Sequence, residues 1–104
     1  MTSREILVAA RAKVAQGWTQ HAAARRADGA LSMTKSKDAV CWCAVGAINA
    51  VATCTGDVDL ALKVIGVELG HGLILFNDTP GRTQAEVLAV FDRAIARCDA
   101  ALIG

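Results

Sequence analysis

Hydrophobic residues recur every four positions along the first part of the chain, which places them on one face of a helix. The stripe is formed by Ile6, Ala10, Val14 and Trp18. Thr2 and Glu5 precede it in the register of a capping box, in which each residue satisfies a free amide of the first helical turn. The pattern predicts a helix that begins after Thr2 and ends at Gly17 or in the turn that follows.

Residues 38–54, DAVCWCAVGAINAVATC, are nearly uncharged and contain three of the four cysteines. We expect a second helix from Ser36 to Gly56, buried on several sides because apolar residues surround its whole circumference. On such a helix Cys41 and Cys43 face opposite ways, since residues two apart are rotated by roughly 200°. A stripe of small residues on this helix allows another element to approach closely: Cys43, Gly46, Ala47, Ala50 and Cys54.

Two further helices follow from the same pattern. Asp57 is a suitable N-cap for one of them, and Thr83 begins the last helix in a capping box with Glu86. Between these helices the apolar run LILF, residues 73–76, favours a short extended segment, and NDTPGR is typical of a turn. Segment 30–37, ALSMTKSK, has no periodicity and is predicted to be a mobile loop.

Together these elements predict a mainly all-α fold, a compact four-helix bundle, in a single small domain over residues 1–104. The composition agrees, because abundant alanine and only 4% aromatic residues favour closely packed helices over sheets. The formal net charge of +1 provides no strong field toward nucleic acid or a membrane. Charges interrupt the apolar residues after Met1, so we expect a soluble cytoplasmic protein with reduced thiols.

Three motifs occur in a specific order: GWTQ at 17–20, CWCAVGAINA at 41–50 and FNDTPGRTQAEVLAVFDRAI at 76–95. Their combination resembles an uncharacterised family of small bacterial and phage proteins, a domain of unknown function. That family commonly has Trp-Asn-Asp where this chain has Phe76-Asn77-Asp78. The resemblance implies a prokaryotic context associated with mobile elements, and it supplies no established reaction.

Cys41 is a candidate nucleophile, because the start of the expected helix is a setting that activates a thiol. His71 followed by Asn77 or Asp78 gives the chain order of a Cys-His-Asn arrangement, and the three weak catalytic candidates are Cys41, His71 and Asp78. The alternative is that the cysteines are small buried hydrophobic residues. One residue between Cys41 and Cys43 is too few for a usual zinc pair, so we expect no metal and no cofactor.

The turn before the last helix supplies candidate binding residues, because free amides at a helix start bind phosphate or carboxylate. These residues are Asn77, Asp78 and Arg82. The same Asn and Asp also suit an Asx-type turn whose role is structural. A second candidate set flanks the 30–37 loop and consists of Arg25, Arg26, Lys35 and Lys37. Asp28, Asp38 and the lack of an interleaved aromatic platform disfavour nucleic acid as its ligand.

Trp18 and Trp42 are expected to be core anchors whose indole N–H groups find partners. The sequence thus contains no convergent catalytic set, and its small size and family resemblance favour a non-catalytic binding protein. We expect it to occupy a protein partner, one with an acidic surface, in phage or mobile-element biology. An anti-defence inhibitor, for example an anti-CRISPR protein, is one concrete form. The competing class is a cysteine-dependent hydrolase or transferase that uses Cys41 and His71.

Overall fold

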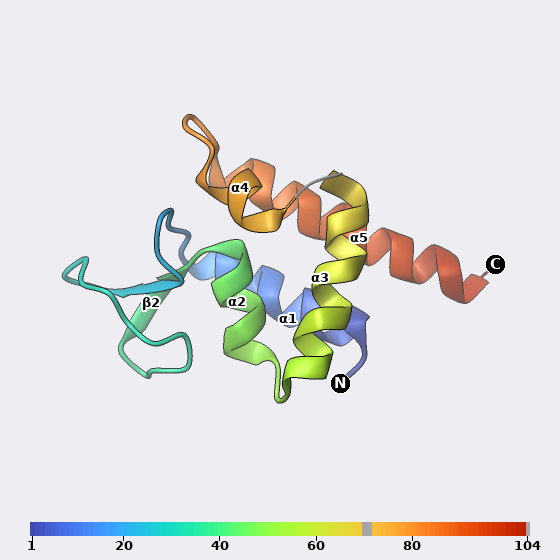
Figure 1. Ribbon diagram of the computed structural model, residues 1–104, viewed down its shortest axis with the longest axis horizontal. Helices are drawn as coiled ribbons and strands as arrows, with labels where there is room; N and C mark the ends of the chain where they lie inside the picture. The colour runs from blue at the N-terminus through green and yellow to red at the C-terminus, as the bar shows by residue number, and fades with distance from the viewer. Residues whose placement is uncertain (70–71, 104) are drawn as a thin grey trace.

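The computed structural model describes residues 1–69 and 72–103, with side chains described for 1–66 and 72–100. These residues form a mostly helical fold with a small antiparallel sheet (Figure 1). The helices are α1 (Ser3–Gln16), α2 (Ala44–Val51), α3 (Thr55–Leu69), α4 (Leu73–Asp78) and α5 (Gln84–Ile103), and the strands are β1 (Ala24–Arg26) and β2 (Ala39–Trp42). The expected mainly helical class is confirmed, but the described residues are not a pure four-helix bundle.

Helix α1 lies at the centre of the core and runs antiparallel to α5 (Figure 1). Arg4 pairs with Asp99 at 2.6 Å and Arg11 pairs with Asp92, so the early part of α1 meets the late part of α5. Between the two helices lies a fully buried apolar layer, which removes its side chains from water. The layer contains Ile6, Leu7, Ala10 and Val14 from α1 and Val87, Val90, Phe91 and Ala94 from α5.

Both predicted capping boxes are present. Thr2 Oγ1 accepts the Glu5 amide at 3.1 Å, and Glu5 Oε1 accepts the Thr2 amide at 3.0 Å. Thr83 and Glu86 make the same reciprocal pair at 2.9 and 3.2 Å. In each box the backbone hydrogen bond from the threonine lowers the pKa of the glutamate. The local sequence therefore determines where α1 and α5 begin.

The predicted helix from Ser36 to Gly56 is wrong. Residues 39–42 form β2, which pairs with β1 and also bonds to the end of α1: the Trp42 amide donates to Gly17 O at 3.0 Å. The Cys43 amide donates to Ala23 O at 3.2 Å, and α2 begins only after Cys43. Backbone partners from residues 17–26 thus take the amides that a longer helix would have used within itself.

Two shorter predictions also change. Residues 73–76, expected to be extended, belong to α4, where burial of Leu73 and Phe76 against the core stabilises a helix of only six residues. Residues 19–29, TQHAAARRADG, also suit a short helix closed by Asp28-Gly29 from sequence alone, but they contain strand β1 instead. Both segments are short, and tertiary packing overrides local preference most easily in such segments.

Gly46 marks the closest approach between α2 and the segment before β1. A Cβ placed on Gly46 would overlap the backbone carbonyl of Ala23, which cannot move without disturbing its hydrogen bond to the Cys43 amide. The small-residue stripe predicted on this helix therefore does contain a close contact, although the partner is a loop and not a helix. Cys54, expected on the same stripe, is exposed and precedes α3.

We predict that Gly46→Ala lowers the free energy of unfolding by about 2–3 kcal/mol, because the added methyl group pushes α2 away from the backbone of Ala23. Gly66→Ala is the matched control: a Cβ at Gly66, on α3, meets no atom within 4 Å. Since alanine is a better helix former, the control raises stability by about 0.5–1 kcal/mol. Urea unfolding of both variants measures the difference, and equal stabilities would contradict the close contact at Gly46.

Candidate functional site

Asn77, near the end of α4, is a fully buried side chain with a complete set of hydrogen bonds. Its Oδ1 accepts Trp18 Nε1 at 2.8 Å and the Ala44 amide at 3.0 Å. Its Nδ2 donates to Thr19 O at 3.1 Å and to Asp78 Oδ1 at 2.9 Å. The amide thus connects the end of α1, the start of α2 and α4, and we call these contacts the Asn77 network.

Residues 20 and 21 extend the network along the backbone of α4. Gln20 Nε2 donates to the carbonyl oxygens of Asn77 and Thr79, both at 3.0 Å, and the His21 amide donates to Asp78 Oδ1 at 3.0 Å. His21 has a φ of 65°, a left-handed conformation that a residue other than glycine adopts at a cost. The expected Asx-type turn is therefore replaced by long-range contacts between motifs 57 to 59 residues apart.

The Asp78 carboxylate lies at the edge of this network and is partly open to solvent. Burial acts to raise the pKa of Asp78, but the hydrogen bonds from His21 and Asn77 outweigh it, and the net pKa is lowered. His21 Nδ1 is 3.8 Å from Asp78 Oδ2, while the His21 side chain is largely exposed. Asp78 is therefore ionised at neutral pH, with one oxygen fixed by two donors.

A pocket of about 420 Å³ opens beside Asp78. It lies between the segment before β1, the start of α2 and α4, and is lined by His21, Ala22, Ala23, Cys43, Val45, Ile74 and Asp78. Cys43 caps α2, and its sulfur accepts the Gly46 amide at 3.2 Å. Burial is the main cause that raises the pKa of the Cys43 thiol, so this sulfur is a neutral thiol at neutral pH.

The structure does not put Cys41 where the sequence suggested. Cys41 lies in β2, two residues before the N-cap of α2 and outside its first turn, is half-buried, and its sulfur makes a weak contact to Arg25 O at 3.9 Å. His71, the proposed base, lies outside the described residues. Asp78 is brought to Cys43 and His21 instead. The described part of the chain contains no group of three or more His, Cys, Asp or Glu residues that could hold a metal ion.

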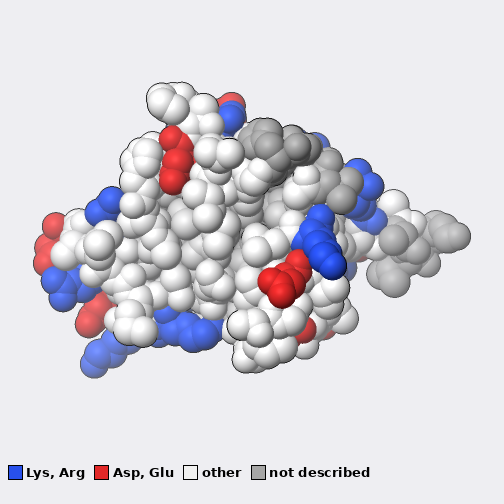
Figure 2. Space-filling model, in the orientation of Figure 1, with Lys and Arg blue, Asp and Glu red and all other residues white. Residues whose placement is uncertain are grey.

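Three of the basic candidates support the fold. Arg82 stacks on the Phe76 ring at 3.8 Å and donates to Phe76 O at 2.9 Å. Arg25 donates to Thr19 Oγ1 and to Gly29 O, and Lys35 Nζ reaches three carbonyl oxygens at the C-terminal end of α2. Arg26 pairs with Asp28, and Lys37 is exposed. On the face shown in Figure 2, basic and acidic groups are mixed around the end that carries these residues, with no broad single-sign area.

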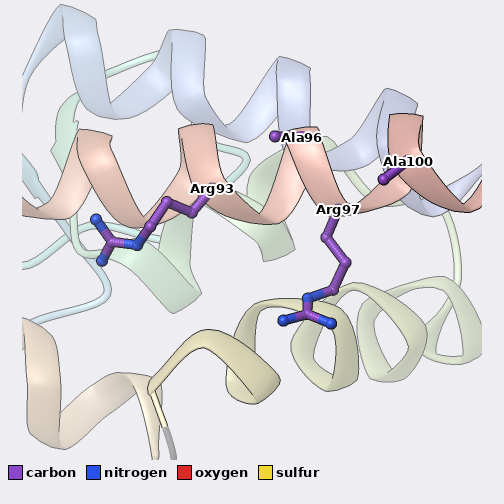
Figure 3. Close-up of a pocket in the computed structure, with 4 residues that line it drawn as sticks. All are labelled: Arg93, Ala96, Arg97 and Ala100. Carbon is purple, nitrogen blue, oxygen red and sulfur yellow. The ribbon is translucent and has the colours of Figure 1, made fainter.

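A second pocket, of about 400 Å³, lies on α5 and is lined by Arg93, Ala96, Arg97 and Ala100. Figure 3 shows that both arginines extend from one side of α5, with Arg97 directed toward α3. Arg93 and Arg97 both interact elsewhere in the protein. The pocket is lined by residues of α5 alone, so it is an open surface hollow and not an enclosed site.

Sequence reasoning missed His21 and Cys43 as members of one pocket and Gln20 as a member of the network. One signal was present: a tryptophan in a core needs a partner for its indole N–H. That partner is Asn77 for Trp18 and Thr34 O, at 3.0 Å, for Trp42. Trp42 is confirmed as a core anchor, 3% exposed, whereas Trp18 is half-buried against the core.

The chain belongs to the family of unknown function DUF6197, whose model matches residues 1–97. The match includes all three motifs and the whole Asn77 network. Comparison with curated proteins and with solved structures finds no match. No helix among the described residues is long and apolar enough to cross a membrane.

We predict that Asn77→Ala lowers the free energy of unfolding by about 3 kcal/mol or prevents folding, because it leaves several buried polar groups without partners. The Trp18 indole, the Ala44 amide and the Thr19 carbonyl would lose their bonds. Asn49→Ala, at a half-buried position on α2, is the matched control and changes the free energy of unfolding by less than about 1 kcal/mol. If both variants lose the same free energy of unfolding in urea, the Asn77 network stabilises the fold no more than an ordinary half-buried asparagine does.

We also predict the order in which the thiols react with iodoacetamide in the folded protein. Cys54 is exposed and reacts first, whereas Cys43 is buried with a raised pKa and reacts at least tenfold more slowly. Mass spectrometry of the labelled peptides measures each rate. A Cys41 that reacts fastest, with a pH midpoint well below that of a free thiol, would contradict this order and favour the cysteine-dependent enzyme.

Proposed function

We propose that the protein is a non-catalytic binding protein that acts by occupying a protein partner. The observation that supports this most is the exposure of large apolar side chains on the segment between β1 and β2. Leu31 is 71% exposed and Met33 is 81% exposed. Burying one such side chain contributes about 1.5–3 kcal/mol, so a partner that covers both gains substantial binding energy. We call residues 27–37 the β1–β2 loop.

The β1–β2 loop is fixed to the rest of the fold by contacts on both sides. Trp42 Nε1 donates to Thr34 O at 3.0 Å, and Lys35 Nζ donates to Asn49 O and Ala52 O at 2.7 Å. The Ser32 amide donates to Ala24 O at 3.0 Å. The loop was predicted to be mobile, yet these contacts give it a defined conformation. A preordered loop loses less conformational entropy on binding, which favours affinity.

The chemistry around the loop indicates the kind of partner. Val40, three residues beyond the loop on β2, is also exposed and is a third apolar side chain that a partner could cover. The charged side chains of residues 25–38 are Arg25, Arg26, Lys35 and Lys37 against Asp28 and Asp38, a basic excess. We therefore propose a partner that offers an apolar depression with an acidic rim. Rim charges of this kind act mainly on association rate and selectivity.

The biological setting is part of the same proposal. The resemblance to small bacterial and phage proteins favours a mobile-element context, and inhibition of a bacterial defence system, such as a CRISPR effector, suits a small binding protein. The support for this setting is the resemblance alone. The binding surface is the part that can be tested on the protein directly.

We predict that the double variant Leu31→Ser/Met33→Ser loses at least tenfold in partner affinity and keeps the melting temperature of the native protein. Both side chains are exposed, so their replacement removes binding area without removing core. The control is Leu60→Ser, which alters a leucine 54% exposed on α3. The test is quantitative pull-down from a bacterial lysate at several salt concentrations, followed by affinity measurement on the partner recovered.

Two results would overturn the proposed surface. One is a partner that binds the double variant and the Leu60→Ser variant equally well. The other is a pull-down in which, at every salt concentration, the native chain retains no protein beyond those that the double variant also retains. Loss of binding in the double variant together with a lower melting temperature would also count against it, because the loop would then act through the fold.

A further inference from the structure

The pocket beside Asp78 combines aliphatic walls with one fixed carboxylate. Its walls come from Ala22, Ala23, Val45 and the exposed side of Ile74. Asp78 is the acidic residue of its lining, and Cys43 contributes a thiol. We infer that this pocket binds a primary ammonium group on a short aliphatic chain, the chemistry of a lysine side chain or a free alkylamine. This inference does not depend on the surface proposed for the β1–β2 loop.

The geometry of Asp78 provides the charge and its direction. Oδ1 already accepts the His21 amide at 3.0 Å and Asn77 Nδ2 at 2.9 Å. Oδ2 lies 3.8 Å from His21 Nδ1, which is longer than a hydrogen bond, so it can still accept a donor from a ligand. Because the two internal donors hold the carboxylate in place, it does not need to reorganise when a cation binds.

The same geometry favours an ammonium over a guanidinium group. A guanidinium binds best to a carboxylate that offers both oxygens to its planar fork, whereas an ammonium is a compact charge that one oxygen can hold. Here Oδ1 already accepts two internal donors, so Oδ2 is the oxygen left to hold a ligand. A volume of about 420 Å³ also lies within the range of small-ligand pockets, so an extended butyl chain fits along the alanine and valine walls.

The start of α2 borders the pocket, and its positive end would oppose a cation if its amides were free. The structure occupies them with acceptors. The Ala44 amide donates to Asn77 Oδ1, the Gly46 amide to Cys43 Sγ, and the Ala47 amide to Cys43 O. The carboxylate of Asp78, with the His21 ring beside it, is therefore the electrostatic feature that a ligand meets.

The test is a titration of the ¹⁵N-labelled protein with n-butylammonium chloride at constant ionic strength, observed by NMR. We expect saturable shifts of the Ala22, Ala23 and Val45 amides. n-Butanol, the uncharged analogue, and n-butylguanidinium bind at least fivefold more weakly. Shifts that do not saturate, or equal binding of the three compounds, would overturn the inference.

Asp78→Asn removes the charge and keeps an oxygen that can accept from His21 and Asn77. We expect it to weaken n-butylammonium binding at least tenfold, while Asp59→Asn, an exposed change of equal charge on α3, binds as the native protein does. Unchanged affinity in Asp78→Asn would refute the site. Ile74→Lys gives a second test that does not alter the network: the ammonium group introduced there should block the pocket, whereas Leu75→Lys, on the same helix but outside the lining of this pocket, should not.

A peptide with one central lysine, acetyl-Ala-Lys-Ala-amide, separates the two sources of the ammonium group. Tighter binding of the peptide than of n-butylammonium, with the same dependence on Asp78, assigns the pocket to a lysine side chain. Tighter binding of n-butylammonium assigns it to a free amine. Failure of both compounds to bind would overturn the inference without affecting the β1–β2 loop, whose test uses other residues.

Discussion

A buried side-chain amide costs free energy unless its two donor and two acceptor positions are all used, and Asn77 finds a partner for each of them. Those partners come from chain segments that are far apart in sequence, so the bonds form only when α1, α2 and α4 are all in place. The requirement therefore selects one arrangement of the helices among the many that apolar burial alone would allow. The rest of the fold is arranged around Asn77, because its Oδ1 positions both Trp18 and the start of α2.

The contacts of Trp42 explain why the chain forms strands in an otherwise helical protein. Trp42 must place its indole in the core, and its backbone must serve the end of α1, with its amide donating to Gly17 O and its carbonyl accepting the Thr19 amide. An extended backbone does both, whereas a helix would turn its amide inward on itself. Cys43 then ends the extended segment and caps α2 with its sulfur. The uncharged stretch around Cys41 and Cys43 is thus a strand followed by a helix cap, and its chemistry is mainly structural.

The elements that local sequence could predict are those whose signals are local. The starts of α1 and α5 follow from capping boxes, and α3 follows from its apolar spacing, with a start two residues earlier than Asp57. The division of the middle of the chain into β2 and α2 could not be predicted in this way, because it depends on backbone partners from residues 17–26. The candidate pocket could not be predicted either, because its lining residues also come from segments that are distant in sequence. Asp78 was recognised as a polar candidate, but nothing in the spacing placed it beside His21 and Cys43.

The Asn77 network and the pocket share Asp78, and this links stability to recognition. Oδ1 of Asp78 belongs to the network, and Asp78 also lines the pocket, so the same carboxylate is part of the fold and of the proposed ligand site. The lowered pKa of Asp78 makes the stability of the fold depend on pH. Since the folded state binds the Asp78 proton less readily than the unfolded chain, the stabilisation from this carboxylate is present above the unfolded pKa and is lost as pH falls through the folded pKa. Acid therefore weakens the contacts to His21 and Asn77 and removes the charge from the pocket together, which means that a ligand held by Asp78 is released under the same conditions that loosen its support.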